Sequence, residues 1–170
     1  MEDRIILVNE KDEQIGTGEK LEVHKKGDLH RAFSILVFDS QGKLIVHKRA
    51  EGKYHSGGLW TNTCCSHPRV GEDLENSIHR RLKEEMGFDC LLEEKFSFVY
   101  SAQLDVLREH EFDHVFFGNY DGECKPDPEE VSEVKKISWD ELTSDIANSP
   151  ESYTYWFKII VSEINKRNLV

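Results

Sequence analysis

One segment constrains the fold more than any other, because it carries a complete helix signature. Leu74, Ile78 and Leu82 recur every four positions within residues 72–86, so they lie on one face of a helix. Acidic residues open the segment, where they favour the positive end of a helix dipole, and Gly87 follows it as a C-cap glycine does. The pattern predicts an amphipathic helix over residues 72–86 that buries its apolar face.

Short apolar runs between turn residues predict strands on both sides of this helix. The predicted strands are residues 5–8 and 14–16 in one hairpin, 32–38 and 44–48 in a second across the turn 39–42, then 96–102, 111–120 and 133–137. A capping box at 138–141 begins a short helix, and residues 153–167 form an amphipathic one. We therefore expect an α/β sandwich with a curved mixed β-sheet. A length of 170 residues suits one domain, residues 1–170.

The charge and the apolar pattern narrow the function classes. A formal net charge of -11 argues against a general nucleic-acid binder, which needs lysine and arginine to neutralise phosphates. No apolar run approaches the roughly 20 residues that span a bilayer, and no secretory signal is visible at the N-terminus. The four cysteines form no CxxC pair, so we expect free thiols. These features predict a cytoplasmic protein with no membrane or nucleic-acid partner.

The centre of the chain carries a specific motif. Residues 58–68 read Gly-Leu-Trp-Thr-Asn-Thr-Cys-Cys-Ser-His-Pro, followed by Gly71-Glu72 and by Arg-Arg-Leu-Lys-Glu-Glu-Met-Gly at 80–87. The motif strongly resembles the type I isopentenyl diphosphate isomerases, a branch of the Nudix superfamily. The resemblance extends from residues 16–20 through Glu109-His-Glu111 to Trp156, which is nearly the whole chain. It implies a Nudix-like α/β/α sandwich that converts isopentenyl diphosphate to dimethylallyl diphosphate in isoprenoid biosynthesis.

The Nudix box separates isomerisation from hydrolysis. Two positions depart from its pattern, since Ser66 replaces a glycine and Arg81 replaces a glutamate, whereas the box is kept at Glu72, Arg80, Leu82, Glu84, Glu85, Gly87 and Phe88. In hydrolases the missing glutamate helps to hold the cations that activate water, so a fixed positive charge there disfavours hydrolysis. Both departures are typical of the isomerase branch.

Moving a carbon–carbon double bond needs an acid and a base that face each other, because one proton is added and another removed through a tertiary carbocation. The resemblance assigns these roles to Cys65 and Glu111, without fixing which protonates first. An arbitrary cysteine is more often a small buried hydrophobe. Glu109 and Glu111 stand two apart, so on a strand both point to one face.

The resemblance also implies a metal site with imidazole and carboxylate ligands, namely His24, His30, His67, Glu109 and Glu111. Such a set suits one divalent ion, Zn²⁺, Mn²⁺ or Mg²⁺, and the identity of the ion stays open. Its expected role is to order the site and to polarise Glu111. We assign the other histidines to surface or hydrogen-bonded positions: His47, His55, His79, His110 and His114.

The remaining site residues bind the two ends of the substrate. Trp156 is expected as an aromatic wall for the cation, with Tyr100 beside the reacting carbons and Trp60 closing the pocket. From its helix pattern alone, Trp156 is as well explained by core packing. The resemblance assigns the diphosphate to Lys20, Arg49, Lys53 and Arg81. Glu85 then holds a Mg²⁺ that bridges the diphosphate oxygens. For Glu72 and Glu84 we also weigh capping or ion pairing.

Two other functions compete with this reading. One is a Nudix hydrolase of a nucleoside diphosphate derivative, favoured by the preserved Glu84-Glu85 and Gly87. The other is a non-catalytic module that binds a metal or a prenyl diphosphate, which has no use for an acid and a base. The sequence contains nothing that demands a dimer, so we expect a monomer with a small-molecule partner.

Overall fold

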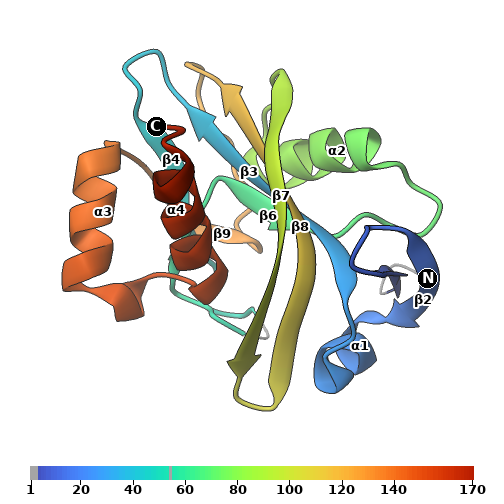
Figure 1. Ribbon diagram of the computed structural model, residues 1–170. Helices are drawn as coiled ribbons and strands as arrows, with labels where there is room; N and C mark the ends of the chain where they lie inside the picture. The colour runs from blue at the N-terminus through green and yellow to red at the C-terminus, as the bar shows by residue number, and fades with distance from the viewer. Residues whose placement is uncertain (1–3, 54) are drawn as a thin grey trace.

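Two neighbouring strands, β3 (His30–Phe38) and β8 (Leu107–Asn119), form the centre of the sheet. They run parallel in a register that extends from His30↔Glu111 to Phe38↔Asn119. The computed structural model describes residues 4–53 and 55–170 (Figure 1). Most of β3 is buried, as expected for a strand covered on both faces.

Antiparallel strands complete the sheet around this pair. They are β1 (Arg4–Val8), β2 (Gln14–Glu19), β4 (Leu44–Arg49), β5 (Trp60–Thr61), β6 (Cys64–Ser66), β7 (Leu92–Leu104) and β9 (Val131–Ile137). The two predicted hairpins are confirmed as β1–β2 and β3–β4. The predicted strands 96–102 and 111–120 belong to one long hairpin, since β7 pairs with β8 as far as Leu104↔Leu107. The sheet is therefore mixed.

The described residues form the α-helices α1 (Lys20–Lys26), α2 (Leu74–Met86), α3 (Trp139–Asn148) and α4 (Tyr155–Arg167), with a 3-10 turn at Pro150–Ser152 before α4. The central predicted helix is confirmed, and it begins at Leu74 because the Asp73 side chain accepts from the backbone N–H of Asn76 as its N-cap. Gly87 ends α2 at φ 72°, a left-handed conformation that glycine adopts without strain. The capping box predicted before α3 is present at Ser138 and Glu141.

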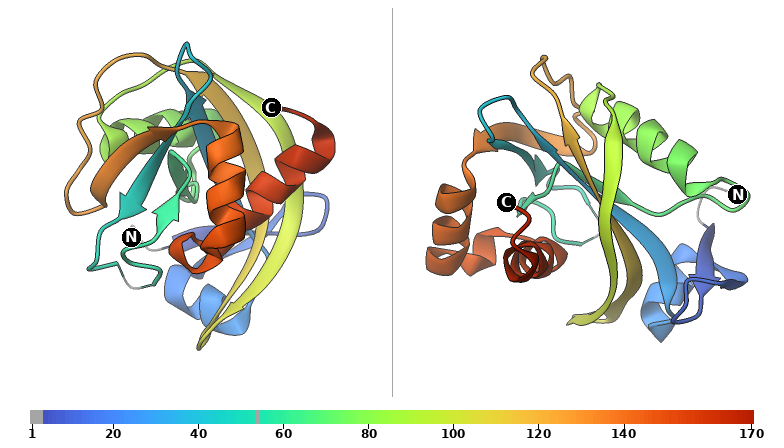
Figure 2. Two further views of the ribbon diagram at one scale, coloured as in Figure 1. Left: turned by 90° about the vertical axis from the view of Figure 1, so that its left-hand side faces the viewer. Right: turned by 45° about the horizontal axis from the view of Figure 1, so that its top comes forward.

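Helices cover both faces of the sheet, with α2 on one side and α3 and α4 on the other (Figure 2). Successive residues of β3 point to opposite faces, so Ile35 packs in the core under α2, whereas Leu36 packs in the core under α4. The predicted α/β/α sandwich is confirmed. In the part of the chain that the structure describes, every helix is too short or too polar to cross a bilayer.

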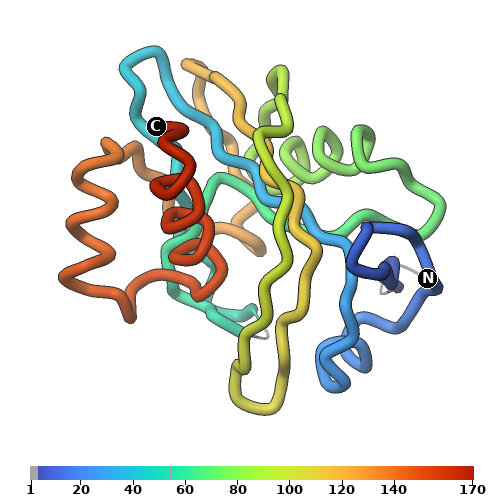
Figure 3. The backbone as a smooth tube through the Cα atoms, in the orientation of Figure 1, coloured from blue at the N-terminus to red at the C-terminus, as the bar shows by residue number. Residues whose placement is uncertain are grey.

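One end of the sheet gathers segments that are distant in sequence. The backbone trace shows α1, the segment between β4 and β5, and the turn between β7 and β8 toward this end (Figure 3). Helix α1, which the sequence did not predict, packs against β8 and is capped by the Glu19 carboxylate, which accepts from Leu21 and Glu22 N–H. This arrangement brings α1 and the start of β3 beside the acidic residues of β8.

Candidate active site

A pocket opens between the sheet and α4 at this end, and it contains about 590 Å³ of space, part of it open to solvent. It is lined by Lys20, Phe33, Ser34, Arg49, Lys53, His55, Cys65, Ser66, His67, Arg81, Glu85, Tyr100, Glu109, Glu111, Glu130 and Trp156. The residues predicted for catalysis, diphosphate binding and metal binding all line this pocket except His24 and His30, which are buried beside it.

The strand alternation of β8 places Glu109 and Glu111 on the same face, as predicted, and both are buried. His30 lies opposite Glu111 in the parallel pairing with β3. Tyr100 lies opposite Glu111 in the antiparallel pairing with β7, and its Oη donates to Glu111 Oε2 at 2.6 Å. The other carboxylate oxygen of Glu111, Oε1, is directed toward two histidines.

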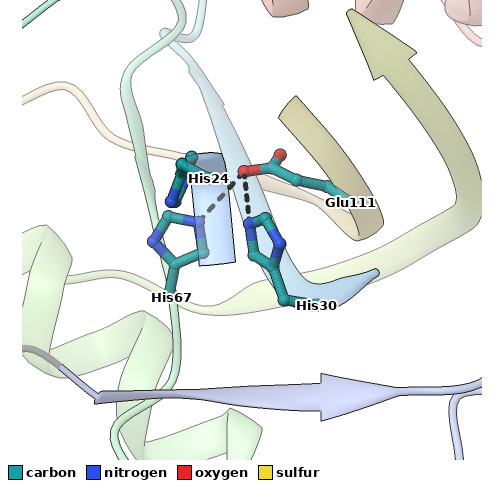
Figure 4. A group of neighbouring side chains, drawn as sticks. All are labelled: His24, His30, His67 and Glu111. Atoms are coloured by element: carbon teal, nitrogen blue, oxygen red, sulfur yellow. Dashed lines mark hydrogen bonds and ion pairs between the residues drawn. The ribbon is translucent and has the colours of Figure 1, made fainter. Parts of the chain in front are cut away.

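Three histidines converge on Glu111 (Figure 4). The ligand atoms of His24, His30, His67 and Glu111 all lie within 4.8 Å of one another. Glu111 Oε1 is 3.0 Å from His67 Nε2 and 3.5 Å from His30 Nε2. Glu109, the fifth predicted ligand, has its Oε2 3.3 Å from His24 Nε2. The structure thus brings the five residues together from α1, β3, the segment after β6, and β8.

Backbone contacts orient two of these rings toward the centre of the cluster. His24 Nδ1 lies 2.6 Å from the carbonyl oxygen of Lys20, and His30 Nδ1 lies 2.9 Å from that of Asp28. When each Nδ1–H donates to its carbonyl, each Nε2 carries a free lone pair, which is the tautomer a metal ligand requires.

The same atoms are buried without hydrogen-bond partners. Within residues 4–53 and 55–170, His24 Nε2, His30 Nε2 and Glu109 Oε2 have none. Buried polar atoms are normally satisfied, so a cluster of unsatisfied acceptors directed at one point fits a bound cation. The residues present therefore fit a divalent ion.

The protonation states of His67 and Glu111 agree with a cation site. Burial lowers the pKa of His67 to about 3, so its ring is neutral at physiological pH. Burial alone would raise the pKa of Glu111, but its hydrogen bonds and charge interactions with His30 and His67 outweigh burial, and the pKa lies well below the usual range. Burial and the charge of Glu111 raise the pKa of Glu109. Two carboxylates held this close need positive charge between them.

Cys65 reaches the pocket from β6, where it pairs with Ser34 of β3. Burial, and then the negative charge of Glu85, raise the pKa of the Cys65 thiol, so this cysteine holds its proton at neutral pH.

Ser34 Oγ donates to Asp113 Oδ2 at 2.9 Å, and both residues are buried. Asp113 follows Glu111 by two positions, so it lies on the same face of β8.

Trp156 is a core residue that also borders the pocket. It is 6% exposed within the core under α4, and it also lines the pocket. The guanidinium carbon of Arg49 lies 5.2 Å from the centroid of its ring. Trp60, expected to close the pocket, is not among its lining residues, and the Lys135 Nζ lies 4.0 Å from the centroid of its ring.

His55, assigned to the surface or hydrogen-bonded histidines, has a hydrogen-bond partner in Ser56 Oγ at 3.2 Å, and it also lines the pocket. Its ring meets that of Trp156 edge to face, with centroids 5.7 Å apart. The segment around His55 has no helical or strand periodicity, and only its proximity to Lys53 in sequence hinted at the site. The other four histidines of that group have hydrogen-bond partners, as expected: His47, His79, His110 and His114.

The cationic end of the pocket contains the four predicted basic residues, Lys20, Arg49, Lys53 and Arg81. Lys53 and Arg81 form ion pairs with acidic side chains. Lys53 Nζ donates to Glu130 Oε2 at 2.5 Å, and Arg81 donates to Glu84 Oε2 at 2.8 Å and to Glu85 Oε1. Glu130 was not anticipated from the sequence.

Charge and burial shift the pKa values of Lys20 and Glu85 in this end of the pocket. Burial, followed by repulsion from Lys53 and Arg81, lowers the pKa of Lys20. Burial raises the pKa of Glu85, against the attraction of Arg81. The ion-pair alternative weighed for Glu72 is the one observed, because Arg80 donates to both of its carboxylate oxygens, at 2.7 and 2.8 Å.

A mixed sheet lies between helical layers, and the pocket lies beside α2, the helix that carries the Nudix box. This fold and this site together define a protein of the NUDIX class. The family model described as NUDIX domain matches residues 28–157. The crystal structure of DR0079 from Deinococcus radiodurans shares the fold with a TM-score of 0.79 at 19% identity, covering 94% of this chain and 98% of that one. A MutT protein from Methanosarcina mazei Go1 aligns with a TM-score of 0.68 at 16% identity, covering 82% of this chain and 95% of that one.

Sequence relatives narrow the class. Isopentenyl-diphosphate Delta-isomerase 2 of Aromatoleum aromaticum is 50% identical, over 96% of this chain and 87% of that protein. Isopentenyl-diphosphate Delta-isomerase 2 of Photorhabdus laumondii is also 50% identical, over 99% of this chain and 96% of that protein. The chain belongs to the isopentenyl-diphosphate Delta-isomerase family within the NUDIX fold, which confirms the resemblance drawn from the motif.

Proposed function

We propose that this chain isomerises isopentenyl diphosphate to dimethylallyl diphosphate, as the names of its relatives describe. The observation that carries the proposal is one pocket that brings together the Cys65 thiol, the Glu111 carboxylate and a basic cluster. Identity of 50% over nearly the full chain with named isomerases supports this activity over hydrolysis. Arg81, in place of a metal-binding glutamate of the Nudix box, supports the same choice.

The reaction moves one double bond without net change in composition. The electrons of the terminal double bond take a proton to form a methyl group, which leaves a tertiary cation on the neighbouring carbon. Loss of a proton from the next methylene returns its C–H electrons as the new double bond. Cys65 and Glu111 are the proposed acid and base, one supplying the first proton and the other removing the second.

The proposed metal site consists of His24, His30, His67, Glu109 and Glu111. These residues would hold a divalent ion, Zn²⁺, Mn²⁺ or Mg²⁺, whose positive charge would fix the Glu111 carboxylate and lower its proton affinity. Tyr100 holds the opposite oxygen of Glu111 through its 2.6 Å hydrogen bond. The carboxylate is thereby constrained on both sides, which prepares it for proton transfer in one geometry.

The two ends of the substrate need opposite environments. Lys20, Arg49, Lys53 and Arg81 are proposed to bind the diphosphate, and Glu85 would hold a Mg²⁺ that supplies further positive charge to it. The indole of Trp156 is proposed to face the carbocation, because an aromatic ring attracts a cation without forming a bond to it.

We also infer a monomeric, cytoplasmic protein whose residues 1–170 act as one domain on a small prenyl diphosphate. The support is that the strands of residues 4–53 and 55–170 join in one sheet and that the four cysteines are free thiols. The net charge of -11 weighs against nucleic acid as a partner.

The decisive experiment incubates the protein with isopentenyl diphosphate and Mg²⁺ and follows both dimethylallyl diphosphate and released phosphate. We expect the isomer without phosphate release, and loss of turnover in Cys65→Ala and Glu111→Gln while both variants still bind inorganic diphosphate. Phosphate release without the isomer would support a hydrolase instead. Undiminished turnover in both variants would exclude the proposed acid and base.

A further inference from the structure

His55 is the one pocket histidine that the proposed metal site does not use. It lies in the segment between β4 and β5, and it is partly buried. The three proposed histidine ligands come from other segments, namely α1, β3 and the chain after β6. His55 therefore approaches the acidic cluster from a separate side.

The contact is with Glu109. Its Oε2 faces His24 Nε2 at 3.3 Å, and its Oε1 lies 3.5 Å from His55 Nε2. A separation of 3.5 Å is beyond a good hydrogen bond, so this contact is an electrostatic one between a ring N–H and a carboxylate oxygen. The imidazoles of His24 and His55 nevertheless contact different oxygens of Glu109. The two contacts together fix the rotation of its carboxylate plane.

The neighbouring residue sets the orientation of the ring. Ser56 Oγ lies 3.2 Å from His55 Nδ1, and when this hydroxyl donates, the ring proton resides on Nε2, toward Glu109. Ser56 has φ 53°, a left-handed conformation that is uncommon for a residue other than glycine and is maintained only where surrounding structure demands it. The turn at Ser56 follows directly on His55 and aims its ring into the pocket.

The segment that carries His55 is tightly built. Arg49 donates from a guanidinium nitrogen to the His55 carbonyl oxygen at 3.3 Å. A Cβ on Gly57 would lie 2.6 Å from the carbonyl oxygen of Glu51, so the chain closes on itself with no room for a side chain. The position of His55 is thus fixed by its own backbone as well as by its contacts.

The same ring supports the aromatic wall. His55 meets Trp156 edge to face, at 84° between ring planes, while Arg49 lies over the indole. One imidazole therefore contacts both the fifth proposed metal ligand and the proposed cation wall.

We propose that His55 is a positioning residue that orients Glu109 for metal binding through its Nε2–H. The inference rests on the proposed metal site. Groups that contact the second oxygen of a carboxylate ligand commonly contribute a factor of roughly 10 to 100 in metal affinity. The ring contact with Trp156 is a separate role, which a substitution can preserve while the N–H is removed.

The test compares His55→Phe, which keeps an aromatic ring but loses the N–H, with His55→Gln, which keeps a donor but loses the ring. Zn²⁺ affinity is measured on each purified variant by competition with a chromophoric chelator. His79→Phe makes the same exchange at a histidine on α2 that pairs with Asp89. Affinity for inorganic diphosphate with Mg²⁺ serves as a second measurement at the other end of the pocket.

We expect His55→Phe to weaken Zn²⁺ binding by roughly 10- to 100-fold, His55→Gln to lose much less, and His79→Phe to match the wild type. Diphosphate affinity stays unchanged in all three. Wild-type affinity in His55→Phe, or equal losses in His55→Phe and His55→Gln, overturns the role of the N–H while leaving the metal site intact. Failure of the wild type to bind Zn²⁺ overturns the metal site itself, and the orientation of Glu109 for metal with it.

Discussion

Tyr100 and Glu111 face each other across the β7–β8 pair, and the Tyr100 hydroxyl donates to Glu111 Oε2 at 2.6 Å. Burial and the charge of Glu111 raise the pKa of Tyr100 well above its ordinary value, so the phenol keeps its proton and stays a donor. The carboxylate proposed as acid or base is therefore held by a donor that does not titrate near neutral pH.

Removing this donor should impair turnover more than binding. Tyr100→Phe leaves one buried oxygen of Glu111 without its partner, and a hydrogen bond to a charged group contributes about 1.5–3 kcal/mol. We expect kcat to fall on the order of 10- to 100-fold with little change in KM, because the diphosphate contacts lie elsewhere. Steady-state kinetics of the two proteins test this. A fall in kcat/KM that comes from KM alone would show that Tyr100 acts in substrate binding.

Removal of the metal should destabilise the folded protein. The buried atoms His24 Nε2, His30 Nε2 and Glu109 Oε2 have no partner among the described residues. A ligand at a hundred times its Kd stabilises by about 2.7 kcal/mol, so chelation should lower Tm by about 5–10 °C for a chain of this size. Calorimetry with and without chelator measures the shift. His30→Ala should have a lower Tm that no longer responds to the chelator, and a persistent response would place the ion elsewhere.

Glu130 should compete with the substrate for Lys53. Their 2.5 Å contact occupies one N–H donor of Lys53, and the Glu130 charge offsets the attraction of Lys53 for a phosphate oxygen. We expect Glu130→Gln to tighten binding of inorganic diphosphate about fivefold, which corresponds to the ~1 kcal/mol of a partly exposed ion pair. Isothermal titration of both proteins measures the change. The effect should vanish in the background of Lys53→Met, and an equal gain in that background would assign it to another cation.

The pH dependence of stability should carry a contribution from His47. Burial lowers the pKa of this residue to about 4 from an ordinary value of 6.5, and its Nδ1 lies 3.0 Å from the Thr63 carbonyl oxygen. Between these two pH values the unfolded chain binds a proton that the folded protein excludes, so stability falls as pH decreases from 6.5 toward 4.

The contribution amounts to about 2 kcal/mol lost between pH 8 and pH 5. Urea unfolding of the wild type and of His47→Gln at both pH values measures this contribution as the difference between the two proteins. The contributions of the other titrating groups cancel in that difference. The wild type should lose about 2 kcal/mol more than the variant over this range. Equal losses in the two proteins would show that His47 is protonated in the folded state.

Local signals in the sequence were sufficient for several elements. The period of Leu74, Ile78 and Leu82 together with the Gly87 cap defined α2 to within two residues, because helix hydrogen bonds and caps involve near neighbours in the chain. The same holds for the capping box at α3. Helix α1 was missed because seven residues give little periodicity, and its packing on β8 involves residues far away in sequence.

In the candidate site, too, some features were predictable from the sequence and others depended on the fold. Residue identities within the motif around Cys65, and the two-residue spacing of Glu109 and Glu111, sufficed to nominate the main groups. Which side chains meet was decided by the tertiary structure, because the β3–β8 register that sets His30 against Glu111 joins strands separated by much of the chain. His55 and Glu130 lie in segments without a repeating pattern, and only folding brings them to Glu109 and Lys53. The sequence by itself determined the chemistry available, whereas the long-range pairing of strands and loops determined its geometry.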